Sequence, residues 1–174
     1  NNYLDMDGLV CISADHYGGA VQATEYLCKL GHCKIGLLSG RFSPQVSEAR
    51  IEGFVKTLAK YDIPVDDRFI ADIEPALEDG EEIMTRMLRE VDRPTAFFCT
   101  NDTIAAGAMK AVTRAGLRVP EDIAIIGFDD SYISRVVEPE LTTVRIDAAK
   151  MGCLAMQTLF DLIAGMPVEK AHIQ

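Results

Sequence analysis

The sequence predicts an α/β fold, a doubly wound parallel sheet with helices on both faces. Between Gly18 and Ile126, helix-like and strand-like segments alternate with short connections, as in strands joined by crossover helices. Residues 123–126 form an unbroken apolar run bounded by Pro120 and Gly127, which is typical of a strand covered on both faces. With 174 residues and 48% hydrophobic composition, the chain can bury the core of one domain, with fragments of a second.

The first half of the chain predicts two helices on either side of a strand. The first helix covers residues 19–30, and Gly31 is placed to end it. A strand over residues 34–39 follows. Ser43 and Pro44 suit the cap and first turn of a second helix. The apolar face of that helix has the clearest helical spacing in the chain and consists of Ile51, Phe54, Val55 and Leu58.

The alternation continues in the second half. A short strand near residues 68–71 precedes a helix over residues 76–91, and residues 95–99 form a buried strand. Asn101 and Asp102 can cap the next helix, over residues 103–115. Residues 95–127 are therefore a β-α-β unit, whose right-handed crossover puts both strands in one sheet with their carboxyl ends at the same edge. The residues of the 76–91 helix that are expected to face inward are Ile83, Met87, Leu88 and Val91.

Beyond Pro139 the pattern changes. Residues 141–146 are β-branched and extended, and Asp147 opens a last helix that Gly165 and Pro167 stop. Residues 168–174 are expected to end without a closing strand. Both ends of the chain look cut from something larger.

Charge and composition exclude several classes of function. The net charge of −10 and the pI near 4.7 repel a phosphate backbone, so this chain is not expected to bind nucleic acid by itself. No apolar run approaches the ~20 residues of a transmembrane helix, and no signal peptide is visible. The odd, scattered cysteines are typical of small buried hydrophobes and a reducing cytoplasm. They are Cys11, Cys28, Cys33, Cys99 and Cys153.

Polar residues follow three of the predicted strands at the edge where ligands of open α/β sheets bind. Arg50 lies on the helix after the first strand, Asn101 follows the strand over residues 95–99, and Asp129 ends the strand that begins at residue 123. A guanidinium, an amide and a carboxylate can bind the hydroxyls of a sugar-like molecule. The cluster Asp15-His16-Tyr17-Gly18-Gly19, which precedes the first helix, could line the same edge. Each has an alternative role: an exposed charge for Arg50, and a helix cap for Asn101, Asp129 and Asp15. Asp130 is equally a cap for the next helix.

The sequence offers no catalytic, metal or cofactor motif. His16, His32 and Cys33 lack the spacing of zinc ligands. Gly18 and Gly19 are not part of a G-x-G-x-x-G fingerprint, and no Gly-x-Ser-x-Gly elbow occurs. We therefore expect no cofactor, no metal ion and no enzymatic activity.

Four blocks of sequence carry a resemblance to a known family. They are Gly18-Gly-Ala20 with Leu27 and Gly31-His32; Arg50-x-x-Gly53-Phe54; Asn101-Asp102-x-x-Ala105-x-Gly107; and Gly116-Leu-x-Val-Pro-x-Asp-Ile-Ala-Ile-Ile-Gly-Phe-Asp-Asp130 with Pro139-x-Leu-Thr-Thr-Val144. In these blocks the chain resembles the effector-binding core of the lactose/galactose repressor (LacI/GalR) family of bacterial transcription regulators. The likeness covers nearly the whole chain.

The resemblance implies a type I periplasmic-binding-protein-like core, in which two lobes grip a small effector. Residues 15–145 would be the C-terminal, effector-binding lobe, residues 1–14 a remnant of the N-terminal lobe and crossover, and residues 146–174 the crossover and returning helix. The family's DNA-binding headpiece is absent. Arg50, Asn101 and Asp129 match the effector-binding pattern, and Asp15 is a further candidate. Val46, Pro75 and Ile146 depart from sugar-binding relatives.

The leading hypothesis is the sensor domain of a cytoplasmic, homodimeric repressor, which binds a sugar-like effector and reaches operator DNA through the headpiece, with no membrane partner. One alternative is a periplasmic sugar-binding protein of an ABC transporter, and another is a sugar oxidoreductase. The apolar stripe of the last helix would face the missing lobe, so this fragment is expected to self-associate or to be partly disordered. The stripe consists of Ala148, Met151, Ala155, Leu159 and Leu162.

Overall fold

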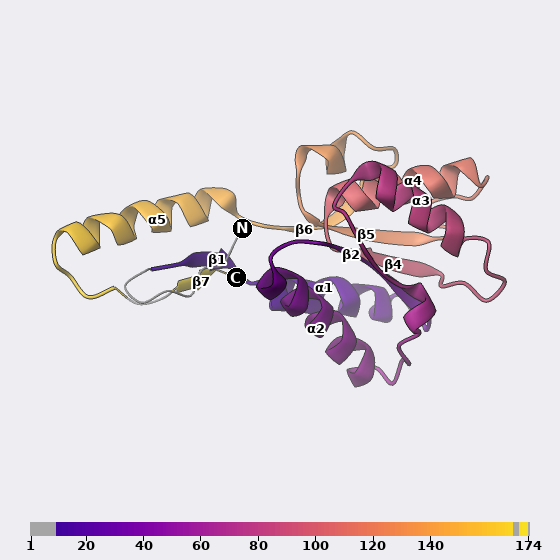
Figure 1. Cartoon of the computed structure of the whole chain (residues 1–174), viewed down its shortest axis with the longest axis horizontal. Coiled ribbons are helices and arrows are strands. Elements are labelled where there is room, and N and C mark those ends of the chain that lie inside the picture. Colours follow the sequence, from indigo (N-terminus) through magenta and orange to yellow (C-terminus); the bar gives the residue numbers. More distant parts are fainter. Residues whose placement is uncertain (1–9, 169–170, 174) are drawn as a thin grey trace.

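A five-stranded, fully parallel sheet forms the body of the molecule (Figure 1). The computed structural model describes residues 10–168 and 171–173. The strands are β2 (Ile35–Gly40), β3 (Ile70–Ile73), β4 (Ala96–Cys99), β5 (Ala124–Asp129) and β6 (Thr142–Arg145). Their order across the sheet is β3-β2-β4-β5-β6. The predicted α/β fold with a parallel sheet is confirmed.

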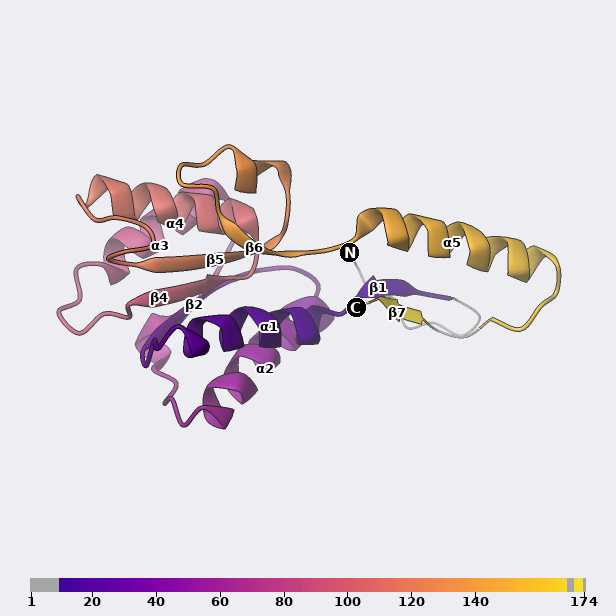
Figure 2. The same cartoon turned by 180° about the vertical axis from the view of Figure 1, so that it is seen from behind.

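Two pairs of helices cover the two faces of this sheet. The helices α1 (His16–Lys29) and α2 (Pro44–Lys60) lie on one face, and α3 (Leu77–Met87) and α4 (Asp102–Arg114) lie on the other, as Figures 1 and 2 show from opposite sides. Successive strand residues point to opposite faces. Leu37, Phe98 and Ile126, which the strand register places side by side, pack under α1 and α2. Leu38 and Ile125 pack under α3 and α4.

The order of the strands creates a switch point between β2 and β4. The chain leaves β2 toward β3 through α2, whereas it leaves β4 toward β5 through α4 on the other face. Connections therefore diverge at the carboxyl ends of β2 and β4, and ligands of doubly wound sheets bind in the crevice at such a point. This carboxyl edge of the sheet is the edge at which the sequence predicts polar residues.

A second, smaller sheet lies outside the main body. It consists of β1 (Ile12–Ala14) and β7 (Ala171–Ile173), which pair in parallel. The expectation that the chain ends without a closing strand was wrong, because β7 finds its partner at the other end of the described chain. The helix α5 (Ala148–Ile163) begins after β6 and extends away from the five-stranded sheet (Figure 1).

The helix α5 exposes most of its apolar side chains. Among its described residues only Thr158 is buried. No described helix, this one included, combines the length and apolar character needed to cross a membrane. Self-association through this face stays a prediction. The large apolar side chains exposed on and just after α5 are Met156, Leu159, Phe160, Leu162, Ile163 and Met166.

Several predicted boundaries shift for local reasons. The helix α1 begins at His16 rather than residue 19, because the Asp15 side chain accepts a hydrogen bond from the Gly18 amide at 2.7 Å. The strand β3 begins later than predicted, after a 3-10 turn, Asp67–Phe69, which Asp66 caps. The helix α3 ends at Met87, and Val91, predicted to face inward, is fully exposed.

Two predicted caps and the cysteine pattern need correction. Ser43 stands at the N-cap position of α2 but makes no side-chain cap bond. Asp130 caps no helix and instead pairs with Arg145 and Arg135. All five cysteines are free thiols, but only Cys28 and Cys99 are buried, whereas Cys33 and Cys153 are exposed. Burial raises the pKa of the Cys99 thiol, which keeps it protonated.

Candidate functional site

An open cavity of about 770 Å³ lies at the carboxyl edge of the five-stranded sheet. Its wall comes from the loop after β2, the first turns of α1 and α2, the end of β5 and the segment that leads into α5. Such a volume suits a small molecule. The residues that line it are His16, Arg41, Phe42, Ser43, Val46, Arg50, Asp129, Ile146, Ala148 and Met151.

Arg50 is the central group of the cavity wall. It lies on the buried face of α2, one turn after Val46, and is only 3% exposed. Its Nη2 donates a hydrogen bond to Asp129 Oδ1 at 3.2 Å, and its Nη1 donates to the carbonyl oxygen of Thr100, just beyond β4. The guanidinium also lies over the Phe128 ring, 3.9 Å from its centroid. Arg50 therefore connects the ends of β4 and β5.

Arg50 and Asp129 each stabilise the charged form of the other. Burial lowers the pKa of the Arg50 guanidinium, and the Asp129 carboxylate partly offsets this effect. Burial likewise raises the pKa of Asp129, and Arg50 opposes that rise. The Asp129 side chain remains 37% exposed, so one face of the ion pair is open to the cavity. Charge-assisted hydrogen bonds from such a pair to ligand hydroxyls are stronger than neutral ones.

Asp129 reaches Arg50 from an unusual backbone turn. The φ angles of Asp129 and Asp130 are 112° and 50°. Residues other than glycine rarely adopt positive φ, and such strain persists only where the surroundings hold it. The turn directs the last side chain of β5 toward α2.

The other two predicted site residues are helix caps. Asn101 Oδ1 accepts a hydrogen bond from the Ile104 amide at 2.8 Å, and Asn101 does not line the large cavity. Asp15 caps α1 and lines a smaller, neighbouring cavity of about 100 Å³. The structure thus brings Arg50 and Asp129 together, and effector contacts of all four candidate residues stay predictions.

Sequence reasoning missed several residues of the wall. Arg41 and Phe42 directly follow β2, so the rule for carboxyl ends could have identified them. His16 was not missed, because it belongs to the cluster over residues 15–19 that was expected to be able to line this edge. Arg41 bonds Asp72 at 3.1 Å, which joins the ends of β2 and β3. Met151, on α5, carried no such signal, because its place in the wall depends on how α5 leaves the sheet.

Buried polar atoms without a partner concentrate at this cavity. Buried polar groups in proteins are normally hydrogen-bonded. Among the described residues, four side-chain atoms depart from this rule: His16 Nε2, Ser39 Oγ, Ser43 Oγ and Arg50 Nε. Three of these four residues line the cavity. Their grouping indicates a place where further polar groups are accommodated.

His16 makes stability depend on pH. Burial and the nearby Arg50 lower its pKa from 6.5 to about 4. As the pH falls below 6.5, the unfolded chain takes up a proton at His16 that the folded chain does not, so stability falls between pH 6.5 and 4. The expected loss is about 2 kcal/mol. Urea unfolding of wild type and His16→Asn between pH 7 and 4.5 measures it, and the variant should give a flatter curve.

His32 provides the matched control for this experiment. Its pKa is also lowered by burial, but it is less buried, and one ring nitrogen is 2.8 Å from the Thr95 hydroxyl. His32→Asn should therefore retain most of the wild-type slope. The carboxylates with lowered pKa, such as Glu25 and Glu81, begin to lose their contribution only near their ordinary pKa of 4.5, at the acid end of the measured range. An unchanged slope in His16→Asn would exclude His16 as the titrating group.

The described part of the chain holds no cluster of three or more His, Cys, Asp or Glu side chains arranged for a metal ion. The polar groups of the cavity are a guanidinium pair, a carboxylate, an imidazole and a hydroxyl. Such a set recognises hydroxyl and acidic groups of a ligand by hydrogen bonds.

Comparisons with known proteins agree with this architecture. Residues 24–174 match a family described as a periplasmic binding protein-like domain. Over 166 residues the chain is 38% identical to the HTH-type transcriptional repressor PurR of Pasteurella multocida, an alignment that covers 94% of this chain and 49% of that protein. The chain thus spans about half the length of the curated relatives it matches.

Solved structures of transcriptional regulators share the fold of this chain. A regulatory protein of the LacI family from Chloroflexus aggregans superposes with a TM-score of 0.90 at 31% identity, covering 99% of this chain and 61% of that one. The transcriptional regulator CelR, solved as a complex with cellobiose, superposes with a TM-score of 0.83 at 27% identity, covering 93% of this chain and 50% of that one.

Proposed function

Because the chain belongs to the periplasmic binding protein-like domain family, with LacI-family regulators among its relatives, we propose that it is the ligand-sensing part of a bacterial DNA-binding transcriptional repressor. The observation that carries the proposal is the Arg50–Asp129 pair, 3.2 Å apart, in a cavity at the switch point of the sheet. The relatives compared above are regulators rather than enzymes, and the proposal includes no chemical reaction.

The proposed effector is a sugar or a sugar derivative. The open face of Asp129 accepts hydrogen bonds from hydroxyl groups, and the guanidiniums of Arg50 and Arg41 donate them. Val46 and Ile146, which depart from sugar-binding relatives, add an apolar wall that the C–H faces of a sugar derivative can contact. The relative CelR was solved with cellobiose. Asn101 and Asp15 are proposed as further contacts.

We assign residues 15–145 to one lobe, and residues 1–14 and 146–174 to a second lobe that completes the cleft. Two observations support this division. The chain leaves the five-stranded sheet after Arg145, and α5 lies away from that sheet (Figure 2). The strands β1 and β7, from opposite ends of the chain, pair with each other rather than with the large sheet. Residues 1–9 lie outside the described residues.

Regulation would follow from a difference in effector affinity between two arrangements of the lobes. An effector that binds the closed arrangement more tightly shifts the population toward it. In the proposed cytoplasmic homodimer this shift changes the affinity of a headpiece, outside this chain, for operator DNA.

A thermal-shift screen of the protein that contains this chain tests the proposal. The panel comprises hexoses, hexuronates, disaccharides such as cellobiose, and nucleobases. A ligand present at 100 times its Kd stabilises the folded state by about 2.7 kcal/mol, so a sugar should raise the melting temperature by several degrees. The same sugar should change the affinity for operator DNA. A nucleobase response would replace the sugar assignment, and a protein that ignores the whole panel and every operator would contradict the proposal.

A further inference from the structure

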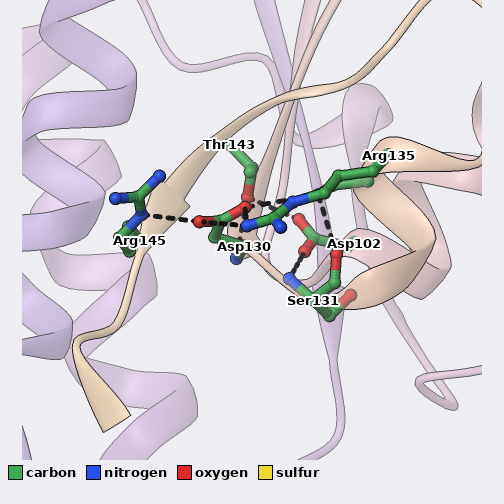
Figure 3. A network of polar contacts seen from close by, with 7 residues as sticks. Asp102, Asp130, Ser131, Arg135, Thr143 and Arg145 are labelled. Atoms are coloured by element: carbon green, nitrogen blue, oxygen red, sulfur yellow. Dashed lines mark hydrogen bonds and ion pairs between the residues drawn. The ribbon is translucent and has the colours of Figure 1, made fainter. Parts of the chain in front are cut away.

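A buried carboxylate lies behind the turn that carries Asp129. Asp102, the first residue of α4, is 1% exposed, and Asn101 rather than Asp102 caps that helix. Asp102 Oδ2 accepts a hydrogen bond from the Ser131 amide at 2.6 Å, and Oδ1 accepts one from the Thr143 hydroxyl at 2.5 Å (Figure 3). These partners offset the unfavourable burial of its charge. Asp102 thus joins the start of α4 to the turn after β5, through Ser131, and to β6, through Thr143.

The two bonds of Asp102 hold the backbone on the far side of Asp129. The Ser131 amide binds Asp102 directly. The Asp130 amide donates to Thr143 Oγ1 at 3.4 Å, and the Thr143 hydroxyl in turn donates to Asp102. Two successive amides therefore depend on one carboxylate. They directly follow Asp129, whose positive φ needs support from its surroundings.

The exposed ion pairs of the same turn are weaker supports. The Asp130 carboxylate accepts a hydrogen bond from Arg145 Nε at 2.6 Å and lies 3.4 Å from Arg135 Nη2. The bond from Arg145 lowers the pKa of Asp130. However, the side chains of Arg145 and Arg135 are 74% and 64% exposed, so solvent screens both pairs. The buried bonds of Asp102 are screened much less.

The strand β5 leaves room for this carboxylate. Gly127 pairs with Thr143 across the sheet. A Cβ at Gly127 would clash with Asp102 Oδ1. The absence of a side chain at Gly127 therefore permits the approach of Asp102 to Thr143. This steric observation is independent of the hydrogen bonds themselves.

We propose that Asp102 and Thr143 form a positioning pair, which holds the Asp129–Asp130 turn so that the Asp129 carboxylate faces the effector. The pair also links this turn to β6, the strand through which the chain leaves the sheet. The inference rests on the proposed function, because Asp129 is the group that is positioned. Neither Asp102 nor Thr143 lines the cavity.

Three variants of the protein that contains this chain test the pair. Thr143→Val keeps the shape of the side chain but removes the hydroxyl, and Thr143→Ser keeps the hydroxyl. Thr142→Val is the matched control, because Thr142 is the exposed neighbour on the same strand. The probe is the panel sugar that gives wild type its largest thermal shift, and calorimetry measures its Kd. Thr143→Val should bind about tenfold more weakly, and the other two within about twofold of wild type.

A crystal structure of each variant without ligand gives a second readout. In Thr143→Val the Asp129 carboxylate should move out of hydrogen-bond range of Arg50, and in Thr143→Ser it should stay. Wild-type affinity in Thr143→Val, or an equal loss in Thr142→Val, would overturn the proposal.

The crystal readout separates this proposal from the proposed function. If wild type binds no member of the panel, the proposed function fails, and an unchanged Asp129 turn in Thr143→Val then refutes the positioning pair as well. Should Thr143→Val not fold, Asp102→Asn replaces it, because the amide cannot accept both hydrogen bonds. Asp102→Asn should show the same displacement and loss, and their absence would refute the pair.

Discussion

Replacing Arg50 with alanine is expected to abolish the effector-induced rise in melting temperature and to lower the free energy of unfolding by about 2–4 kcal/mol. The guanidinium is 3% exposed and bonds both Asp129 and the Thr100 carbonyl. Its removal leaves a half-buried carboxylate without its cation and a gap against the Phe128 ring. The effector would lose its main donor. Thermal unfolding with and without the panel sugar measures both effects.

Two further variants make the Arg50 experiment specific. Arg118→Ala removes an exposed arginine that pairs with Asp122, four residues on in the turn before β5, so it should change stability by less than about 0.5 kcal/mol and leave the shift intact. The double variant Arg50→Ala with Asp129→Asn should be less destabilised than the sum of the single variants, because each single variant leaves one charge without its partner and the double variant leaves none. A retained ligand shift in Arg50→Ala would remove Arg50 from the site.

The fold was predictable because its strands are buried on both faces. A run such as residues 123–126 is apolar throughout, and all four residues are buried in the structure. Pairing between distant segments was not predictable. The strand β7 exists only through its partner β1, and neither carries a distinctive pattern. Val91 was misassigned for a related reason, since helical spacing continues in the sequence after α3 has ended at Met87.

The position of Asp129 at the carboxyl edge of the sheet was predictable from the strand that precedes it. Asp129 ends a buried strand, and the structure places it against Arg50. Asn101 and Asp15 are different, because a helix cap and a ligand contact use the same side-chain oxygen. The contact of His16 with Arg50, which is far along the chain, was not predicted. Such approaches depend on packing between helices and leave no mark in local sequence.

Replacing Gly107 with alanine is expected to destabilise the fold by about 3 kcal/mol, which corresponds to roughly 5–10 °C in melting temperature. Gly107 lies inside α4, where α3 crosses it. A Cβ there would clash with the backbone carbonyl of Leu77 and lie 2.8 Å from the Glu81 nitrogen. Backbone cannot move aside as a flexible side chain can, so the two helices would have to separate. Thermal unfolding without ligand measures the loss.

Gly152 is the matched control, because it also lies inside a helix, α5, but a Cβ there would meet nothing within 4 Å. Alanine is a better helix former than glycine, so Gly152→Ala should stabilise α5 by about 0.5–1 kcal/mol. The same substitution should therefore have opposite signs at the two positions. If Gly107→Ala proved as stable as wild type, close approach of α3 and α4 would not explain the glycine.

Separation of these helices would also disturb α4, whose first turn carries Asp102 and follows the Thr100 carbonyl that binds Arg50. Gly107→Ala should thus weaken effector binding through the position of α4, although Gly107 itself lies outside the cavity wall.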